Sequence, residues 1–128
     1  MKVTILRIID PTALGTYVEF STPYGVGSSL FADPEIKEGL TYDVEINIDD
    51  DFFWNENISP SIKHAPSIDF HSGKLHITAE LISSEDDGCG ALRIGDSIAL
   101  ISLNQAHYPL PMFVDISARE ISLHPTHI

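Results

Sequence analysis

The stretch TYDVEINID, residues 41–49, alternates apolar and polar side chains without interruption and decides the fold class. Successive side chains of a β-strand point to opposite faces, so this period of two predicts a strand with one face in a core and the other in solvent. The apolar face would carry Tyr42, Val44, Ile46 and Ile48, and the polar face Asp43, Glu45, Asn47 and Asp49.

The chain before this strand predicts two further strands and a short turn. Residues 2–9 are rich in Val, Ile, Leu and Thr on both alternation phases, which is typical of a central strand covered on both sides. Residues 16–21 alternate as a second strand, and STPYGVGSS, residues 21–29, has the proline and glycines of a loop. DPEIKEG, residues 33–39, predicts at most one helical turn near residues 34–38.

The chain after it reads as strands joined by turns. Residues 67–81 predict a hairpin over Ser72-Gly73, with Phe70 opposite Leu75 and Ile68 opposite Ile77 on its buried face. The exposed face would place Asp69 opposite His76. Residues 83–91 predict a polar loop, residues 92–103 a Gly-Asp turn leading into another strand, and residues 112–123 one last long strand.

Seven or eight short strands with frequent turns predict an all-β domain spanning residues 1–128, a small antiparallel barrel or sandwich. We favour the barrel. LRIGDSI, residues 92–98, resembles the leucine, Gly-Asp turn and strand of small OB-type barrels, and this stretch of about seven residues also occurs in many other β-proteins. An OB-like barrel is therefore one form of the predicted fold.

The charge balance restricts the classes of partner. Seven Lys+Arg against 19 Asp+Glu give a net charge of −12. This charge opposes binding to the phosphate backbone of nucleic acid and to an anionic membrane surface. It attracts a basic protein over a screened range of about 8–10 Å.

The cellular setting is predicted from the cysteine count and the hydropathy. A single cysteine, Cys89, cannot form an internal disulfide, and the opening MKVTILRIID is a poor secretory signal. The longest uncharged run, residues 97–114, is broken by polar residues and two prolines, so no transmembrane segment is expected. We expect a reduced, cytoplasmic protein.

The stretch NIDDDFFWNEN, residues 47–57, sets three carboxylates against three aromatics and admits several interpretations. A calcium loop of the EF-hand kind would need glycine where Phe52 stands. A catalytic acid pair is disfavoured because adjacent residues of an extended chain project to opposite faces. The plainest interpretation is a solvated turn over Asp49–Asp51, after which Phe52 and Trp54 return to the core.

Recognition of a basic partner is the remaining interpretation, and charge density favours it. Residues 33–56 hold nine acids and one lysine, and so eight of the twelve net negative charges. A core does not need this concentration, whereas it would accelerate encounter with a basic protein. Phe53, out of phase with its neighbours, would be exposed as an anchor of about 2 kcal/mol. The predicted partner-binding residues are Asp43, Glu45, Asp49, Asp50, Asp51, Phe53, Trp54 and Glu56.

Histidine and cysteine give no specific site. His71 and His76 flank the predicted hairpin turn without facing each other directly, and a proline separates His124 from His127. Cys89 lies in DDGCG, where neighbouring negative charge suppresses the thiolate, so it reads as an incidental loop residue. No metal, cofactor or catalytic residue is predicted.

We therefore expect a non-enzymatic protein that presents an acidic surface to a basic partner. One instance would be an immunity or inhibitor protein that neutralises a basic bacterial toxin or nuclease. A first alternative is a barrel that binds a small ligand in its interior, using Tyr17, Tyr42, Tyr108 and the histidines. A second is an accessory or assembly protein that uses a strand edge, for which the first strand is the candidate.

Overall fold

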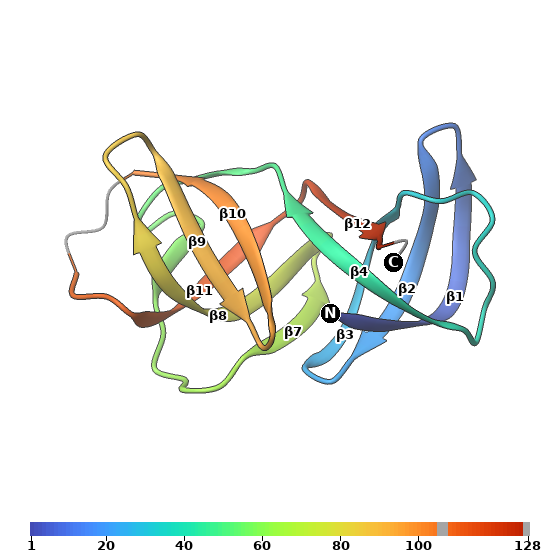
Figure 1. Cartoon of the computed structure of the whole chain (residues 1–128), viewed down its shortest axis with the longest axis horizontal. Coiled ribbons are helices and arrows are strands. Elements are labelled where there is room, and N and C mark those ends of the chain that lie inside the picture. The colour runs from blue at the N-terminus through green and yellow to red at the C-terminus, as the bar shows by residue number, and fades with distance from the viewer. Residues whose placement is uncertain (105–107, 127–128) are drawn as a thin grey trace.

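The computed structural model describes residues 1–104 and 108–126, which form twelve strands and no helix (Figure 1). The all-β class is confirmed, and the strands number twelve where seven or eight were predicted. Figure 1 shows two lobes side by side, one with β1–β4 and β12 and the other with β8–β11. In chain order the strands are β1 Lys2–Thr12, β2 Gly15–Thr22, β3 Gly25–Phe31, β4 Thr41–Ile48, β5 Asp51–Phe52, β6 Ile58–Pro60, β7 Ser67–His71, β8 Lys74–Ser84, β9 Cys89–Ile94, β10 Ser97–Leu103, β11 Met112–Ala118 and β12 Ile121–Pro125.

Five strands of the first lobe close into a barrel. The strands β4, β1, β2 and β3 are neighbours in that order, which is a Greek key, and β12 closes the ring by pairing with β3 and β4. The β3–β12 ladder is parallel, so this barrel is mixed rather than purely antiparallel. This closed five-stranded Greek-key barrel is compatible with the OB-like form of the prediction.

The second lobe is an insertion between β4 and β12 of the barrel. Its ladders run from β5 through β10, β9, β8 and β11 to β6, and a bridge between Trp54 and Ile58 links the two ends. The hairpin of β7 and β8 has the predicted register, with Ile68 opposite Ile77 and Asp69 opposite His76. Phe70 differs from its predicted burial, because it is 37% exposed beside the turn.

The lobes meet at several places, and backbone hydrogen bonds define two junctions among them. Gly25 of β3 pairs with Ile68 of β7, and the Ile68 amide donates to the Tyr24 carbonyl at 3.0 Å. The second junction is the crossover where the chain leaves β4 and later returns to β12, and there the Asp49 amide donates to the Glu120 carbonyl at 2.9 Å. Buried apolar side chains form a cluster with members in both lobes.

The prediction that the first strand is covered on both sides is wrong. Leu6 and Ile9 are 45% and 46% exposed, whereas Val3 and Ile5 are fully buried. The β1–β2 register shifts between Ile5 and Arg7 and again after Ile8. Such bulges change which side chains face the core. The apolar residues at both odd and even positions therefore indicate a bulged strand with one buried face.

Two predicted loops also differ from the structure. The predicted loop at residues 21–29 is a tight turn, after which β3 begins at Gly25. Residues 33–39, where at most one helical turn was predicted, form turns held in part by the Glu35 amide donating to the Asp33 carboxylate at 2.8 Å. The loop predicted at residues 83–91 shortens to residues 85–88, because β8 and β9 extend into it.

The long last strand predicted over residues 112–123 is two strands. Residues 119–120 separate β11, in the second lobe, from β12, in the barrel. This break lies at the crossover, where the chain passes from one lobe to the other.

Candidate binding groove

The solvent face of β4 forms one wall of an open groove. Asp43, Glu45 and Asp49 are exposed, and Val44, Ile46 and Ile48 are buried, as the alternation predicted. Among the described residues, none of the three side chains forms a hydrogen bond or an ion pair.

The opposite wall comes from β10 in the second lobe. Ile98 and Leu100 line the groove there, with Ser97 between them and the turn, and these two aliphatic side chains are 51% and 67% exposed. Exposed aliphatic side chains beside carboxylates combine an apolar contact surface with a charged one. Neither residue was predicted as part of a site, although five of the seven residues from 97 to 103 are apolar.

The groove between these walls has a volume of about 750 Å³. Its lining includes neither lysine, arginine nor histidine among the described residues, and its cationic group is the Met1 amine, which donates to the Val44 carbonyl at 3.1 Å. The residues that line it are Met1, Asp43, Val44, Glu45, Ile46, Asn47, Ile48, Asp49, Ser97, Ile98, Leu100 and Thr126.

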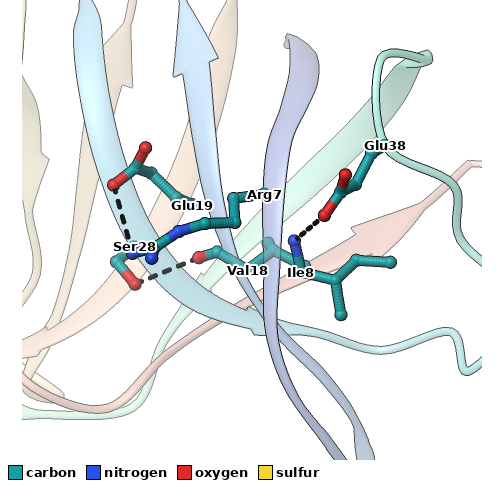
Figure 2. A network of polar contacts seen from close by, with 6 residues as sticks. All are labelled: Arg7, Ile8, Val18, Glu19, Ser28 and Glu38. Atoms are coloured by element: carbon teal, nitrogen blue, oxygen red, sulfur yellow. Dashed lines mark hydrogen bonds and ion pairs between the residues drawn. The ribbon is translucent and has the colours of Figure 1, made fainter.

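The ion pairs of the described chain lie away from these carboxylates. Arg7 and Glu19 approach to 3.9 Å on the outer face of β1 and β2 (Figure 2), and Arg93 binds Glu80 at 3.0 Å. Both pairs are solvent-exposed, so each contributes at most about 1 kcal/mol. Lys2 lies opposite Asp43 in the β1–β4 ladder, with no ion pair within 4 Å.

Asp50 serves the fold and does not face the groove. Its carboxylate accepts the backbone amides of Arg119 at 2.9 Å and Glu120 at 2.8 Å. This partly buried carboxylate therefore accepts hydrogen bonds from two backbone N–H groups at the break between β11 and β12. Asp50 and its neighbour Asp49 therefore have different surroundings, because Asp49 lines the groove and Asp50 does not.

The other predicted partner-binding residues lie beyond the crossover. Phe52 is buried, and Phe53 is 47% exposed. Trp54 is partly buried, with its indole N–H donating to the Asn104 carbonyl at 3.3 Å and its ring 5.0 Å from that of Tyr108. Asp51 is exposed at the start of β5. Neither Asp51, Phe53 nor Trp54 lines the groove, and Glu56 lines a different pocket.

That second pocket, of about 300 Å³, lies between β7, β8, β6 and β11. His71 and His76 both line it, and their rings stack with centroids 3.7 Å apart and an interplanar angle of 6°. This stack was not predicted, because only directly opposite pairs were considered and the β7–β8 register places His71 opposite Lys74. Diagonal neighbours on one face of a sheet also come into contact. His76 Nδ1 lies 3.1 Å from the Ser117 hydroxyl, and its buried Nε2 has no partner in the described chain.

The remaining candidate ligands are dispersed. Among the described residues, no group of three or more His, Cys, Asp or Glu side chains is placed to hold a metal ion. Cys89 is a half-buried free thiol at the first position of β9, so its prediction as a loop residue is wrong. His127 lies outside the described residues.

The tyrosines predicted for an interior ligand site are not gathered in a cavity. Tyr17 and Tyr108 are 38% and 40% exposed. Tyr42 packs edge-on against Phe31 with ring centroids 5.3 Å apart, and its hydroxyl accepts the Lys37 amide at 3.1 Å.

Comparison of the chain with protein-family models, with curated proteins and with solved structures identifies no match. No helix of the described residues is long and apolar enough to cross a membrane.

Proposed function

We propose that this chain is a non-enzymatic binding protein whose groove between β4 and β10 receives a basic segment of a partner protein. The observation that carries the proposal is the groove itself, which is lined by three exposed carboxylates without a side-chain partner in the described chain and by two exposed aliphatic side chains. Binding at this site would pair Asp43, Glu45 and Asp49 with lysine or arginine side chains of the partner. Ile98 and Leu100 would supply apolar contact area.

The balance of charge supports a cationic partner over other classes. The net charge of −12 steers a basic protein toward the surface, and it repels nucleic acid and anionic lipid. An inhibitor of a basic toxin or nuclease fits this chemistry, because such a partner carries cationic residues where it would bind phosphates. Cytoplasmic residence with a reduced Cys89 belongs to the same proposal.

The test is a comparison of two charge-matched variants with a defined cationic probe. The probe is the acetylated and amidated peptide KVKVKVK, and its acidic counterpart EVEVEVE is the negative control. One variant combines Asp43→Asn, Glu45→Gln and Asp49→Asn. The matched variant combines Asp10→Asn, Glu35→Gln and Asp86→Asn, three exposed residues outside the groove whose side chains form no bond in the described chain.

We expect the wild-type chain and the matched variant to bind KVKVKVK more tightly as salt is lowered. The groove variant should bind it about tenfold more weakly, since loss of three charge pairs worth about 0.5 kcal/mol each corresponds to a change of that size. Equal binding by both variants would contradict the proposed site, because the remaining net charge alone would then explain the attraction.

A further inference from the structure

We propose that the second pocket binds a small aliphatic diamine, whose two ammonium groups pair with Asp69 and Asp115. This polar pocket, of about 300 Å³, lies on one face of the sheet formed by β7, β8, β11 and β6. It shares no lining residue with the groove between β4 and β10. Its ligand is a small molecule and not a basic protein, so the site goes beyond the proposed function.

Strand register gathers polar side chains on this face in two rows. One row, read across the four strands, consists of Ser67, Thr78, Asp115 and Ser59. The other consists of Asp69, His76 and Ser117. Between them runs a row of four buried isoleucines, Ile68, Ile77, Ile116 and Ile58. Because side chains alternate between the faces of a sheet, the isoleucines face the core and both polar rows face the pocket.

The polar face is partly withdrawn from water. Thr78 is 2% exposed, and the other members of the two rows are half-buried, with the exception of the exposed Asp69. The segments before and after β6 line the same pocket through Glu56 and Lys63. The polar face of an antiparallel sheet is commonly solvated, so this degree of burial distinguishes a formed pocket from an open sheet surface.

The charge of the lining favours a cationic ligand. Three acids, Glu56, Asp69 and Asp115, line the pocket together with a single lysine, Lys63. Among the described residues, no ion pair joins these carboxylates to a cation. A charge that is withdrawn from water is usually paired, so the pocket accepts a positively charged group in preference to a neutral or anionic one.

Each aspartate keeps one carboxylate oxygen available to such a group. Oδ1 of Asp115 accepts the Thr78 hydroxyl at 2.5 Å and the Ser61 hydroxyl at 3.0 Å. Oδ1 of Asp69 accepts the Phe70 amide at 2.8 Å. In the described chain, Oδ2 of neither aspartate forms a hydrogen bond. An ammonium group can therefore donate a charge-assisted hydrogen bond to each of these oxygens.

The spacing of the two aspartates favours a ligand with two ammonium groups. Asp69 and Asp115 lie on opposite sides of β8 and in different polar rows, so regular strand geometry places their Cα atoms about 12 Å apart. His76 and Thr78 of β8 lie between them. A linear molecule with an ammonium group at each end can cross β8 and pair with both carboxylates.

His76 supplies a further contact between the two carboxylates. Its Nδ1 lies 3.1 Å from the Ser117 hydroxyl, and its buried Nε2 has no partner in the described chain. A buried polar atom without a hydrogen bond is rare in native proteins. With its proton on Nδ1 and donated to Ser117, His76 accepts a hydrogen bond at Nε2 from the ammonium group at Asp69, which is its direct cross-strand neighbour.

The experiment measures the binding of putrescine to the full chain by isothermal titration at an ionic strength of about 0.15 M. Butylamine is the matched probe, because it has the same carbon chain and one ammonium group. We expect putrescine to bind at least about tenfold more tightly, since it alone can pair with both aspartates.

Two substitutions remove the proposed charges one at a time. Asp69→Asn and Asp115→Asn should each weaken putrescine binding about tenfold and affect butylamine less. Asparagine keeps the Oδ1 acceptor, so the hydrogen bonds from Phe70, Thr78 and Ser61 can be retained.

Two control variants distinguish the pocket from the general charge of the chain. The groove variant removes three carboxylates, and a second variant combines Asp10→Asn with Asp51→Asn, two exposed residues that line neither the groove nor the pocket. We expect both variants to bind putrescine within about twofold of the wild-type chain, because exposed charges outside the pocket are screened by salt.

Imidazole ¹⁵N shifts give a readout in the unaltered chain. Saturation with putrescine should shift the Nε2 resonance of His76 and establish the tautomer with the proton on Nδ1. His64 is the internal control, because it does not line the pocket and its resonances should stay unchanged.

Three outcomes would overturn the diamine site. The first is equal affinity for putrescine and butylamine. The second is a loss of putrescine binding in the control variants as large as that in Asp69→Asn and Asp115→Asn. The third is an Nε2 resonance of His76 that does not move when the chain is saturated with putrescine.

Discussion

The carboxylate of Asp50 accepts the backbone amide of Glu120 at 2.8 Å, across 70 residues of sequence. Together with the bond from the Asp49 amide to the Glu120 carbonyl, this contact fixes the crossover where the chain leaves the barrel and returns to it. It also separates three consecutive aspartates by role, because Asp49 faces the groove, Asp50 holds the crossover and Asp51 begins β5.

Asp50→Ala should destabilise the protein by about 1–3 kcal/mol, because two backbone amides lose a charged acceptor. Urea unfolding followed by circular dichroism measures this loss. Asp51→Ala is the matched control, since the Asp51 side chain is exposed and forms no bond in the described chain, and it should change stability by less than about 0.5 kcal/mol. Equal effects of the two substitutions would argue against a structural role for Asp50.

Gly25→Ala should strain the junction of β3 and β7. Gly25 has φ +143°, and a Cβ built there would lie 1.9 Å from the Ile68 carbonyl oxygen, so the two strands must separate. We expect a loss of about 1–3 kcal/mol beyond that of Gly88→Ala, whose position has φ +86° and no atom within 4 Å of the added Cβ. Thermal unfolding of both variants tests this difference, and similar losses would show that backbone conformation alone matters.

Thr78→Val should destabilise the second lobe by about 1–2 kcal/mol. The buried Thr78 hydroxyl donates to the Asp115 carboxylate at 2.5 Å, and the Ser61 hydroxyl donates to the same oxygen at 3.0 Å. Valine keeps the shape and removes the donor. Adding Asp115→Asn in a double-mutant cycle measures the coupling, which should be absent if the two side chains do not interact.

The local patterns of the sequence predicted the elements that local interactions decide. The β4 alternation and the β7–β8 register follow from side-chain period and turn chemistry, and the structure confirms both. The single strand predicted over residues 112–123 failed because its break depends on Asp50, far away in the sequence. The apolar first strand was misassigned because bulges between Ile5 and Asp10 shift its phase without a local signal.

Only one wall of the candidate groove could be predicted from the sequence. Asp43, Glu45 and Asp49 were identified from charge density along one strand. Ile98 and Leu100 were not, because only the tertiary structure brings β10 close to β4, so that their side chains line the same groove as those carboxylates. Asp51, Phe53 and Glu56 are near Asp49 in sequence and not in the groove, since the crossover redirects the chain.

Leu100→Ser should weaken binding of the KVKVKVK peptide three- to tenfold and change stability little. Leu100 is 67% exposed, so its apolar surface is available to a partner and contributes little to the core. Ile62→Ser is the matched control, because Ile62 is 93% exposed and does not line the groove. Isothermal titration of both variants with the peptide distinguishes an apolar contact from attraction by charge alone.

The most direct test of the acidic groove is chemical-shift mapping of the ¹⁵N-labelled full chain titrated with KVKVKVK. We expect the largest shift changes at residues 43–49 and 97–100, with little change at the other acidic turn, residues 85–88. Shift changes spread over all acidic surfaces, or concentrated away from β4 and β10, would contradict the groove as the binding site.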